Sequence, residues 1–234
     1  MMTLPIYYYE TIHSTNAEAK KMILEGVREG VLLAKHQTAG RGRLGRSFFS
    51  ENGIFMSMIL SPEKIPFDTG FLTSAVAAAT CRAITEKGFD AGIKWVNDIY
   101  LDGKKICGIL AEAVSIGAET LAYVIGIGIN VGESDFPEEI QDIAAALPLN
   151  EKEKEDLFFS VLNNIETVLT ENKKTILSYL KEKSIVLGKD IRFFGATDGE
   201  GTAIDLDGNG GLVVLTRENE TIILTGGEIS VRVR

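Results

Sequence analysis

One short segment of this chain is rich in both arginine and glycine. Residues 38–46 read Thr-Ala-Gly-Arg-Gly-Arg-Leu-Gly-Arg, so Arg41, Arg43 and Arg46 stand among three glycines. Arginine offers a planar, permanently charged fork to phosphate and carboxylate oxygens, and glycine lets backbone amides approach an anion closely. The segment matches neither the P-loop nor the dinucleotide-binding pattern. It indicates an anion site of another type, with a solvated surface loop as the alternative.

A second group of polar residues follows a strand candidate. The sequence reads Lys94-Trp95-Val96-Asn97-Asp98, and Lys105 stands a few residues later in a largely apolar run. A strand lysine flanked by apolar residues can be aimed rigidly into a pocket, and polar groups at a strand end typically belong to binding loops. The alternative is an exposed hairpin lysine. Asn130 offers another amide after Gly126-Ile127-Gly128-Ile129, a segment that also fits a core strand in which glycine makes room.

Composition narrows the class of protein. The 33 acidic and 24 basic side chains give a net charge of −9, which opposes binding to nucleic acid. No stretch approaches the roughly 20 apolar residues of a membrane span, and the first residues lack a secretory signal pattern. Cys81 and Cys107 stand in apolar runs without metal-ligand spacing, which predicts two reduced, buried thiols. We expect a cytoplasmic protein that binds neither DNA nor a membrane.

Apolar periodicity and turn residues predict the elements that position these groups. Strands are expected over residues 6–10, 31–37, 54–60, 92–95, 99–101, 104–112 and 121–129. Asp102-Gly103 favours a type I′ turn in a tight hairpin. Helices are expected over residues 15–26, 71–87, 137–147, 157–170 and 173–184. Thr15 and Glu18 would form a capping box at the start of the first helix, and Gly88 would be the C-cap of the second. Pro137 would begin the third.

The pattern changes after Val186. Short β-rich runs separated by turn clusters cover residues 190–194, 202–206, 212–216, 221–224 and 229–233. Their even spacing predicts a small barrel, too short to fold readily alone. We therefore expect an α+β domain over residues 1–185 with the barrel, residues 186–234, packed on it.

The polar motifs together resemble those of biotin protein ligases in order and spacing. They are Ser14-Thr15-Asn16, residues 37–46, residues 94–98, residues 105–110 and residues 126–130. The resemblance starts near residue 7 and fits the short form of the family, which lacks an N-terminal DNA-binding domain. We therefore expect no repression of transcription through such a domain. It implies an α+β catalytic domain like that of class II aminoacyl-tRNA synthetases, with a mixed sheet and flanking helices, and an SH3-like C-terminal barrel.

The resemblance also implies an activity and its partners. ATP would convert biotin to biotinyl-5′-adenylate, and the biotin would pass to a lysine of a biotin carboxyl carrier domain. The biotin-binding residues would be Ser14, Thr15, Asn16, Gln37, Arg41, Gly42, Arg43 and Lys105. The nucleotide-binding residues would be Arg41, Arg46, Trp95, Asn97 and Asn130. Lys105, Arg43 and Asp98 would be catalytic, with Asp98 also holding Mg²⁺, and a homodimer is expected.

Two alternatives remain open on the sequence. The first is a lipoate or octanoate ligase or transferase of the same wider fold. Against it, the Gly-Arg-Gly-Arg segment differs from the arginine-serine-glycine-rich loop of that group, and Cys107 in an apolar strand is a poor nucleophile. The second is a protein that senses biotin or its adenylate without transfer. The lysine and arginines favour catalysis.

Overall fold

The computed structural model describes residues 4–40, 42, 52–133, 136–195, 197–226 and 230–233. The first strands are β1 (Ile6–Ile12), β2 (Gly30–Gln37), β3 (Gly53–Leu60), β4 (Gly92–Lys94), β5 (Asp98–Leu101), β6 (Lys104–Ile116) and β7 (Glu119–Asn130). The later strands are β8 (Asp190–Phe194), β9 (Gly199–Leu206), β10 (Leu212–Thr216), β11 (Thr221–Leu224) and β12 (Ser230–Val233). The helices are α1 (Thr15–Leu24), η2 (Pro62–Lys64), α2 (Thr69–Glu86), α3 (Glu151–Thr170) and α4 (Lys173–Glu182).

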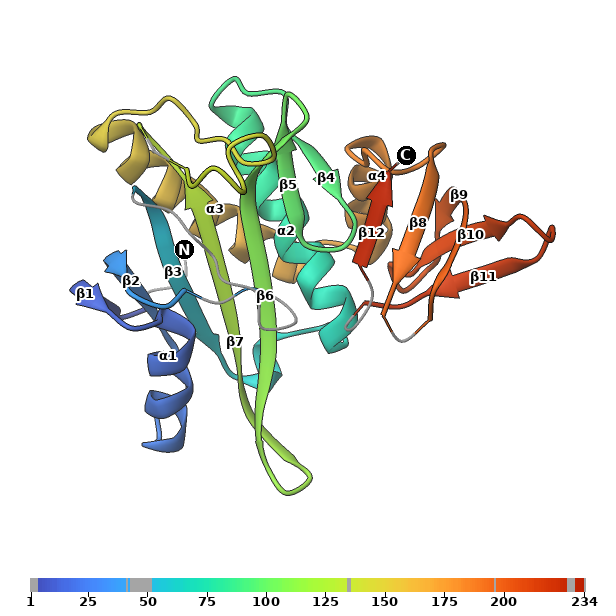
Figure 1. Cartoon of the computed structure of the whole chain (residues 1–234). Coiled ribbons are helices and arrows are strands. Elements are labelled where there is room, and N and C mark those ends of the chain that lie inside the picture. The colour runs from blue at the N-terminus through green and yellow to red at the C-terminus, as the bar shows by residue number, and fades with distance from the viewer. Residues whose placement is uncertain are drawn as a thin grey trace.

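The strands form two sheets (Figure 1). The larger sheet has the order β1-β2-β3-β7-β6-β5-β4 and is mixed, because β1 pairs with β2 in parallel while the other pairs are antiparallel. The smaller sheet is antiparallel, with the order β11-β10-β9-β8-β12. The α+β class and the mixed sheet with flanking helices are confirmed.

Helices cover both faces of the larger sheet. On one face, α1 contacts β2, β3 and β7 and buries a small apolar cluster that includes Ile23, Leu32 and Val124. On the other face, α2 and α3 pack over β3 and β6 and bury the main core. The central strand β3 is buried along its whole length, which agrees with its continuous apolar run. None of the described helices has both the length and the apolar character needed to cross a membrane.

The prediction for the start of α1 was wrong by one residue. The N-cap is Ser14, whose Oγ accepts a hydrogen bond from the backbone N–H of Ala17, and Thr15 is already helical. Serine and threonine cap helices almost equally well, so the local pattern could not separate Ser14 from Thr15. The difference matters, because the side chain of Thr15 is then free to make tertiary contacts.

The helix predicted after Pro137 is also wrong. Residues 138–143 form turns, and the amides of Ala145 and Leu147 bond to the ends of two neighbouring strands. Ala145 N donates to Lys105 O at 2.9 Å, and Leu147 N donates to Asn130 O at 3.0 Å. Gln141 and Ala144 still make i to i−4 bonds, but from Ala145 on the strand contacts replace the bonds that a helix would need. The segment thereby holds the backbones of two predicted site residues.

Other local predictions are confirmed. Asp102 and Gly103 have φ of 50° and 78°, as a type I′ turn requires. Gly88 follows α2 with φ of 92°. Cys81 and Cys107 are free and buried. Helix α3 begins six residues before the predicted start, because Asn150 and Glu153 form a capping box that the prediction missed.

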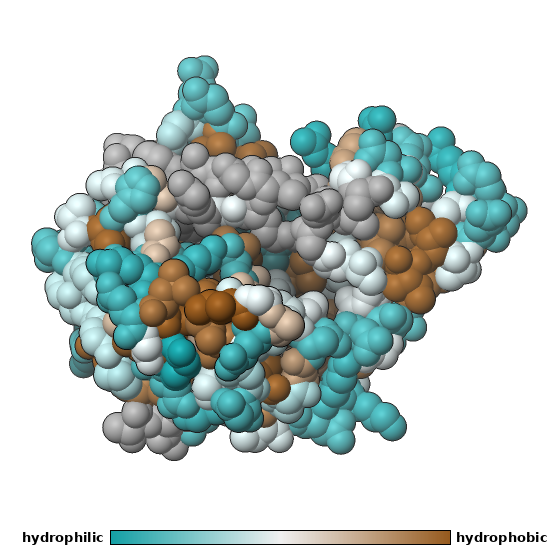
Figure 2. Space-filling model, turned by 90° about the horizontal axis from the view of Figure 1, so that it is seen from below, coloured by the Kyte–Doolittle hydropathy of each residue, from teal (hydrophilic) through white to brown (hydrophobic). Residues whose placement is uncertain are grey.

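The smaller sheet confirms the predicted β-rich end of the chain. All five predicted strands are present, with β9 starting three residues early. The strand order is linear, so a closed barrel stays a prediction. Ile204 and Ile223 are about half exposed on this sheet. The view from below shows an apolar area on that side of the molecule (Figure 2).

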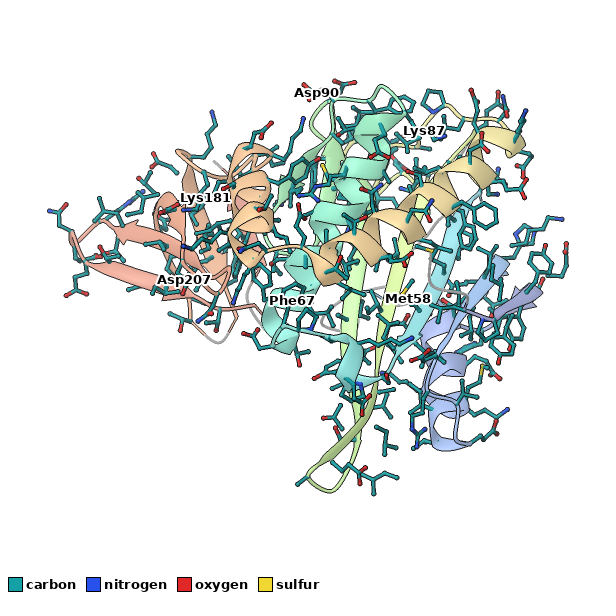
Figure 3. All side chains as sticks on the ribbon, turned by 180° about the vertical axis from the view of Figure 1, so that it is seen from behind. Met58, Phe67, Lys87, Asp90, Lys181 and Asp207 are labelled. Carbon is teal, nitrogen blue, oxygen red and sulfur yellow. The ribbon has the colours of Figure 1, made fainter. Side chains whose placement is uncertain are left out.

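Specific polar contacts join the smaller sheet to the rest of the molecule. Trp95 Nε1 donates to Gly210 O at 2.9 Å, which ties the end of β4 to the β9–β10 turn. Lys181 of α4 lies beside the smaller sheet and pairs with Asp205 at 2.6 Å (Figure 3). Residues of both sheets also belong to one apolar core. The turn that precedes Asn97 and Asp98 is therefore supported by the smaller sheet.

Candidate functional site

The start of α1 carries three buried polar residues. Ser14 and Thr15 are each 3% exposed, and Asn16 is 9% exposed. Thr15 N donates to Oε1 of Gln37, the last residue of β2, at 2.8 Å, and Thr15 Oγ1 lies 3.2 Å from the same oxygen. The helix start and the strand end, which the sequence separates by more than twenty residues, thus form one corner of the site.

A residue that the sequence analysis missed completes this corner. Ser57 on β3 is fully buried, and its Oγ lies 2.7 Å from Thr15 Oγ1 and 2.6 Å from Asn16 Oδ1. We call Thr15, Asn16, Gln37 and Ser57 the hydroxyl–amide cluster. A buried hydroxyl between two polar partners is costly unless it is bonded, so these short contacts hold the four side chains in fixed positions. One serine within an apolar strand was the available sequence signal.

Glu112 on β6, which sequence reasoning missed, and Gly126 on β7 both lie beside Asn16. Glu112 on β6 accepts a hydrogen bond from Asn16 Nδ2 at 3.1 Å and pairs with Lys20 at 2.7 Å. A methyl group on Gly126 of β7 would overlap the amide of Asn16. This contact explains one glycine of the Gly126-Ile127-Gly128-Ile129 segment, since only glycine leaves room for Asn16 against the sheet.

A charged pair lies farther along the same sheet, on β5 and β6. Lys105 Nζ on β6 is 2.7 Å from Asp98 Oδ1 on β5, with about a third of the lysine side chain and a quarter of the aspartate side chain exposed. Asp98 Oδ1 is buried without an aligned hydrogen bond, so the contact is an ion pair by distance alone. We call Lys105 and Asp98 the charged pair.

The register places the cluster and the charged pair on one face. Ser57 pairs with Gly126, and Gly126 pairs with Leu110, so these residues point to the face of Asn16. Gly108, two residues from Leu110 on β6, points the same way, and a methyl group there would lie 3.1 Å from Lys105 Nζ. This is the α1 face of the sheet, and glycines form the floor between the two groups.

The predicted nucleotide residues are held by the backbone around them. Asn97 Nδ2 donates to Ile109 O at 3.0 Å, and Asn130 Nδ2 donates to Ala145 O at 3.0 Å. Asn130 Oδ1 is buried and has no hydrogen-bond partner among the described residues, which leaves it as an acceptor for a bound group. Trp95 is 8% exposed, and its N–H is engaged by Gly210.

The arginine side chains predicted for the site lie outside the described residues. Arg41, Arg43 and Arg46 belong to the part of the chain that the structure leaves undescribed, while Gly42 is partly exposed. Strand β2 ends at Gln37, before these arginines, and β3 begins at Gly53, after them. The chain therefore leaves the sheet at a member of the hydroxyl–amide cluster and rejoins it beside Asn130, which pairs with Gly53.

Burial and charge shift the titration of groups near the charged pair. Burial, together with the nearby Asp98 carboxylate, raises the pKa of Tyr100 to about 12. Burial raises the pKa of the Cys107 thiol well above its usual range, so Cys107 is not a nucleophile at neutral pH. A surface hollow of about 470 Å³ lies on the opposite face, between α2 and α3, and contains none of the predicted site residues.

The arrangement fits a ligand with two unlike ends. The hydroxyl–amide cluster can hold a neutral group that both donates and accepts hydrogen bonds. Lys105 can hold an anion, and Asp98 supplies a carboxylate beside it. Because both lie on the same glycine-floored face, one extended ligand can contact both.

Comparisons with known proteins agree with these features. Residues 8–130 match the biotin/lipoate A/B protein ligase family. "Bifunctional ligase/repressor BirA" of Bacillus subtilis is 41% identical over 158 residues, 64% of this chain and 48% of that protein. "Biotin--[acetyl-CoA-carboxylase] ligase" of Mycobacterium tuberculosis is 29% identical over 92% of this chain and 85% of that protein. This chain therefore spans about half the length of the BirA relatives it matches.

A solved structure extends the likeness to the whole described fold. The biotin protein ligase from Aquifex aeolicus in complex with biotin and ATP superimposes with a TM-score of 0.86. The alignment covers 98% of this chain and 99% of that chain at 28% sequence identity. Both sheets of the present fold therefore have counterparts in that protein.

Proposed function

The chain belongs to the biotin/lipoate A/B protein ligase family, and we propose that it uses ATP to activate biotin and then joins the biotin to a lysine of a carrier protein. The observation that carries this proposal is the near-complete likeness to a ligase that holds biotin and ATP. The Mycobacterium tuberculosis relative, named a ligase for acetyl-CoA carboxylase, supports it over most of both chains.

The two ends of the site match the two ends of biotin. The ureido ring is neutral and carries both N–H donors and a carbonyl acceptor, which suits Ser14, Thr15 and Gln37. Both ends of the Asn16 amide are hydrogen-bonded within the protein, to Ser57 and to Glu112. Asn16 therefore positions this corner of the site. The carboxylate of biotin carries a charge that Lys105 offsets. Arg41, Gly42 and Arg43 complete the biotin contacts in this proposal.

In the first step a biotin carboxylate oxygen attacks the α-phosphorus of ATP. A phosphorus–oxygen bond forms, the bond to pyrophosphate breaks, and biotinyl-5′-adenylate results. Both reactants are anions, so the protein has to align them and offset the negative charge as it redistributes. Lys105 and Arg43 perform this task, and Arg41, Arg46, Asn97 and Asn130 hold the nucleotide. Trp95 contacts the nucleotide through its ring, because its N–H is already bonded to Gly210.

Asp98 is the residue that fits a magnesium ion brought with ATP. No group of three or more acidic, histidine or cysteine side chains stands ready for a metal among the described residues. Mg²⁺ usually takes one or two carboxylates together with substrate phosphates, and the buried Asp98 Oδ1 lacks an aligned hydrogen bond. Such an ion would add positive charge at the phosphates.

In the second step a lysine amine of the carrier attacks the carbonyl carbon of the adenylate. An amide bond forms, AMP leaves, and the amine loses a proton. The amine has to be neutral when it attacks, and Asp98 is the proton acceptor that we assign. Closure of the arginine segment over the adenylate would keep water from hydrolysing it.

The partners and the wider organisation belong to the same proposal. The acceptor is a biotin carboxyl carrier domain of a carboxylase, and the enzyme acts as a homodimer in the cytoplasm. Two buried cysteines without a disulfide suit a reducing compartment. The division at residues 185 and 186 follows the change from helices to the smaller sheet, which begins at β8.

Pyrophosphate release with Mg²⁺ and ATP tests the activity. We expect release with biotin and not with lipoate or octanoate, followed by transfer of the biotin to a carrier domain that is added afterwards. Release with lipoate would move the chain to the other branch of its family. Tight biotin binding without release would instead indicate a sensor.

A further inference from the structure

Glu112 stands at the far end of the hydroxyl–amide cluster from the ligand. We infer that its carboxylate fixes the direction of the hydrogen bonds that run from Asn16 through Ser57 to Thr15, so that Thr15 presents an acceptor to the bound group beside the donor of Gln37. The inference rests on the proposed function, because it names which atoms of the biotin ureido ring the site selects. Glu112 acts through Asn16 and Ser57 and is therefore a positioning residue.

The direction starts with the carboxylate, which can only accept hydrogen bonds. Asn16 Nδ2 lies 3.1 Å from Glu112 Oε2, and Lys20 Nζ lies 2.7 Å from the other oxygen. An Asn16 amide turned the other way would place its oxygen against a carboxylate oxygen, which is repulsive. Asn16 Oδ1 must therefore point toward Ser57.

The single proton of Ser57 then has only one favourable place. Asn16 Oδ1 lies 2.6 Å from Ser57 Oγ and can only accept, so Ser57 donates to it. Ser57 Oγ is left as an acceptor, so the proton of Thr15 Oγ1 goes either to Ser57 Oγ at 2.7 Å or to Gln37 Oε1 at 3.2 Å. Because Ser57 is fully buried, water does not compete for these protons.

The arrangement at the ligand end follows. Thr15 has given its proton to one of these two protein oxygens, so Thr15 Oγ1 can only accept from a ligand. Gln37 Oε1 accepts from Thr15 N at 2.8 Å, so its Nε2 points the other way and donates. The site therefore demands a neutral group with an N–H beside a carbonyl. A cyclic urea meets this demand, and a ring with oxygen in place of that N–H does not.

Glu112→Gln tests this chain of bonds with almost no change in shape. A glutamine amide can accept or donate, so Asn16 can turn over, Ser57 can donate to Thr15, and Thr15 no longer has to accept. Glu119→Gln is the matched control, since Glu119 is exposed and lies at the start of β7, outside the cluster. Ser57→Ala is a second variant, because it removes the relay without touching a charge.

The measurement is calorimetric binding of biotin and of two analogues, each with oxygen in place of one ureido N–H. We expect wild type and Glu119→Gln to prefer biotin strongly over one analogue, and Glu112→Gln and Ser57→Ala to lose roughly three- to tenfold of that preference. A general loss of stability would weaken both ligands equally and leave the ratio unchanged. An unchanged ratio with tight wild-type binding would overturn the inference, whereas no binding of biotin by wild type would overturn the proposed function.

Discussion

The hydroxyl–amide cluster and the charged pair lie on one face of the same sheet but are built differently. The cluster consists of neutral side chains, of which Thr15, Asn16 and Ser57 are buried. Lys105 and Asp98 are charged and partly exposed. Neutral hydrogen bonds depend strongly on direction, whereas a charge acts over a longer distance with little dependence on direction. The cluster therefore suits the choice of ligand, and the charged pair suits the reaction.

The two regions also depend on different parts of the chain. The cluster joins α1, β2 and β3, all within the larger sheet and its covering helix. The charged pair follows a turn that Trp95 anchors to Gly210 in the smaller sheet. Changes in the smaller sheet should therefore reach the reaction before they reach the choice of ligand.

The largest expected effect comes from Lys105→Ala. Removal of this ammonium leaves Asp98 without its cation and the reacting anions without its charge, so adenylate formation should fall roughly 100-fold or more. Pyrophosphate release under saturating biotin and ATP measures the change, and circular dichroism checks the fold.

Lys104→Ala is the matched control for Lys105→Ala. Lys104 Nζ donates to Gln141 O at 3.0 Å and has no contact with Asp98. Its activity should stay within about twofold of wild type. Equal losses in both variants would mean that positive charge on the hairpin matters, and not the aimed side chain of Lys105.

Gly126→Ala should produce the next largest effect, on the cluster. Its new methyl group would overlap the Asn16 amide, and overpacking of this kind costs about 1–3 kcal/mol of unfolding free energy. Chemical denaturation measures the loss, and biotin affinity should fall with it. Gly208→Ala is the control, because nothing lies within 4 Å of its added carbon. Full biotin affinity in Gly126→Ala would show that the position of Asn16 does not matter.

The elements of the fold were largely predictable because their apolar patterns are local. The hairpin turn at Asp102-Gly103 and the long core helix α2 are examples, since turn chemistry and an alanine-rich run fix them. The failure after Pro137 has a physical cause. Its residues have helical spacing, but the amides of Ala145 and Leu147 bond to the backbone carbonyls of Lys105 and Asn130 in the sheet. These tertiary bonds outweigh the helix propensity of the segment.

The candidate site was predictable where a motif combines several polar residues. Lys105 and Asp98 stand near each other in sequence, and the structure pairs them. Ser57 and Glu112 were missed because each is a single polar residue in an apolar strand. Their importance follows only from the register, which sets Ser57 beside Asn16 and Gly126.

Trp95→Phe should separate the two regions by a smaller effect. The ring stays, but the bond to Gly210 O is lost, which should lower the unfolding free energy by about 1 kcal/mol. Adenylate formation should fall severalfold, while the preference for biotin over the analogues with oxygen in place of a ureido N–H should stay unchanged, because the anchor supports only the charged pair. Lys181→Ala, which breaks an exposed ion pair to the same sheet, serves as the comparison and should change neither. A loss of that preference in Trp95→Phe would contradict the separation.

The smallest expected effect is the pH dependence that Tyr100 confers beside the charged pair. Its pKa is raised from 10.0 to about 12, first by burial and then by Asp98. Since the folded protein keeps the phenol neutral longer than the unfolded chain does, this contribution to stability is complete below pH 10.0 and is lost as the pH rises toward about 12. Ultraviolet titration of the folded protein should show a late tyrosine that is absent from Tyr100→Phe. Asp98→Asn should move that titration to lower pH, because it removes the negative charge while burial remains. A titration that stays in place in Asp98→Asn would mean that the carboxylate does not act on Tyr100.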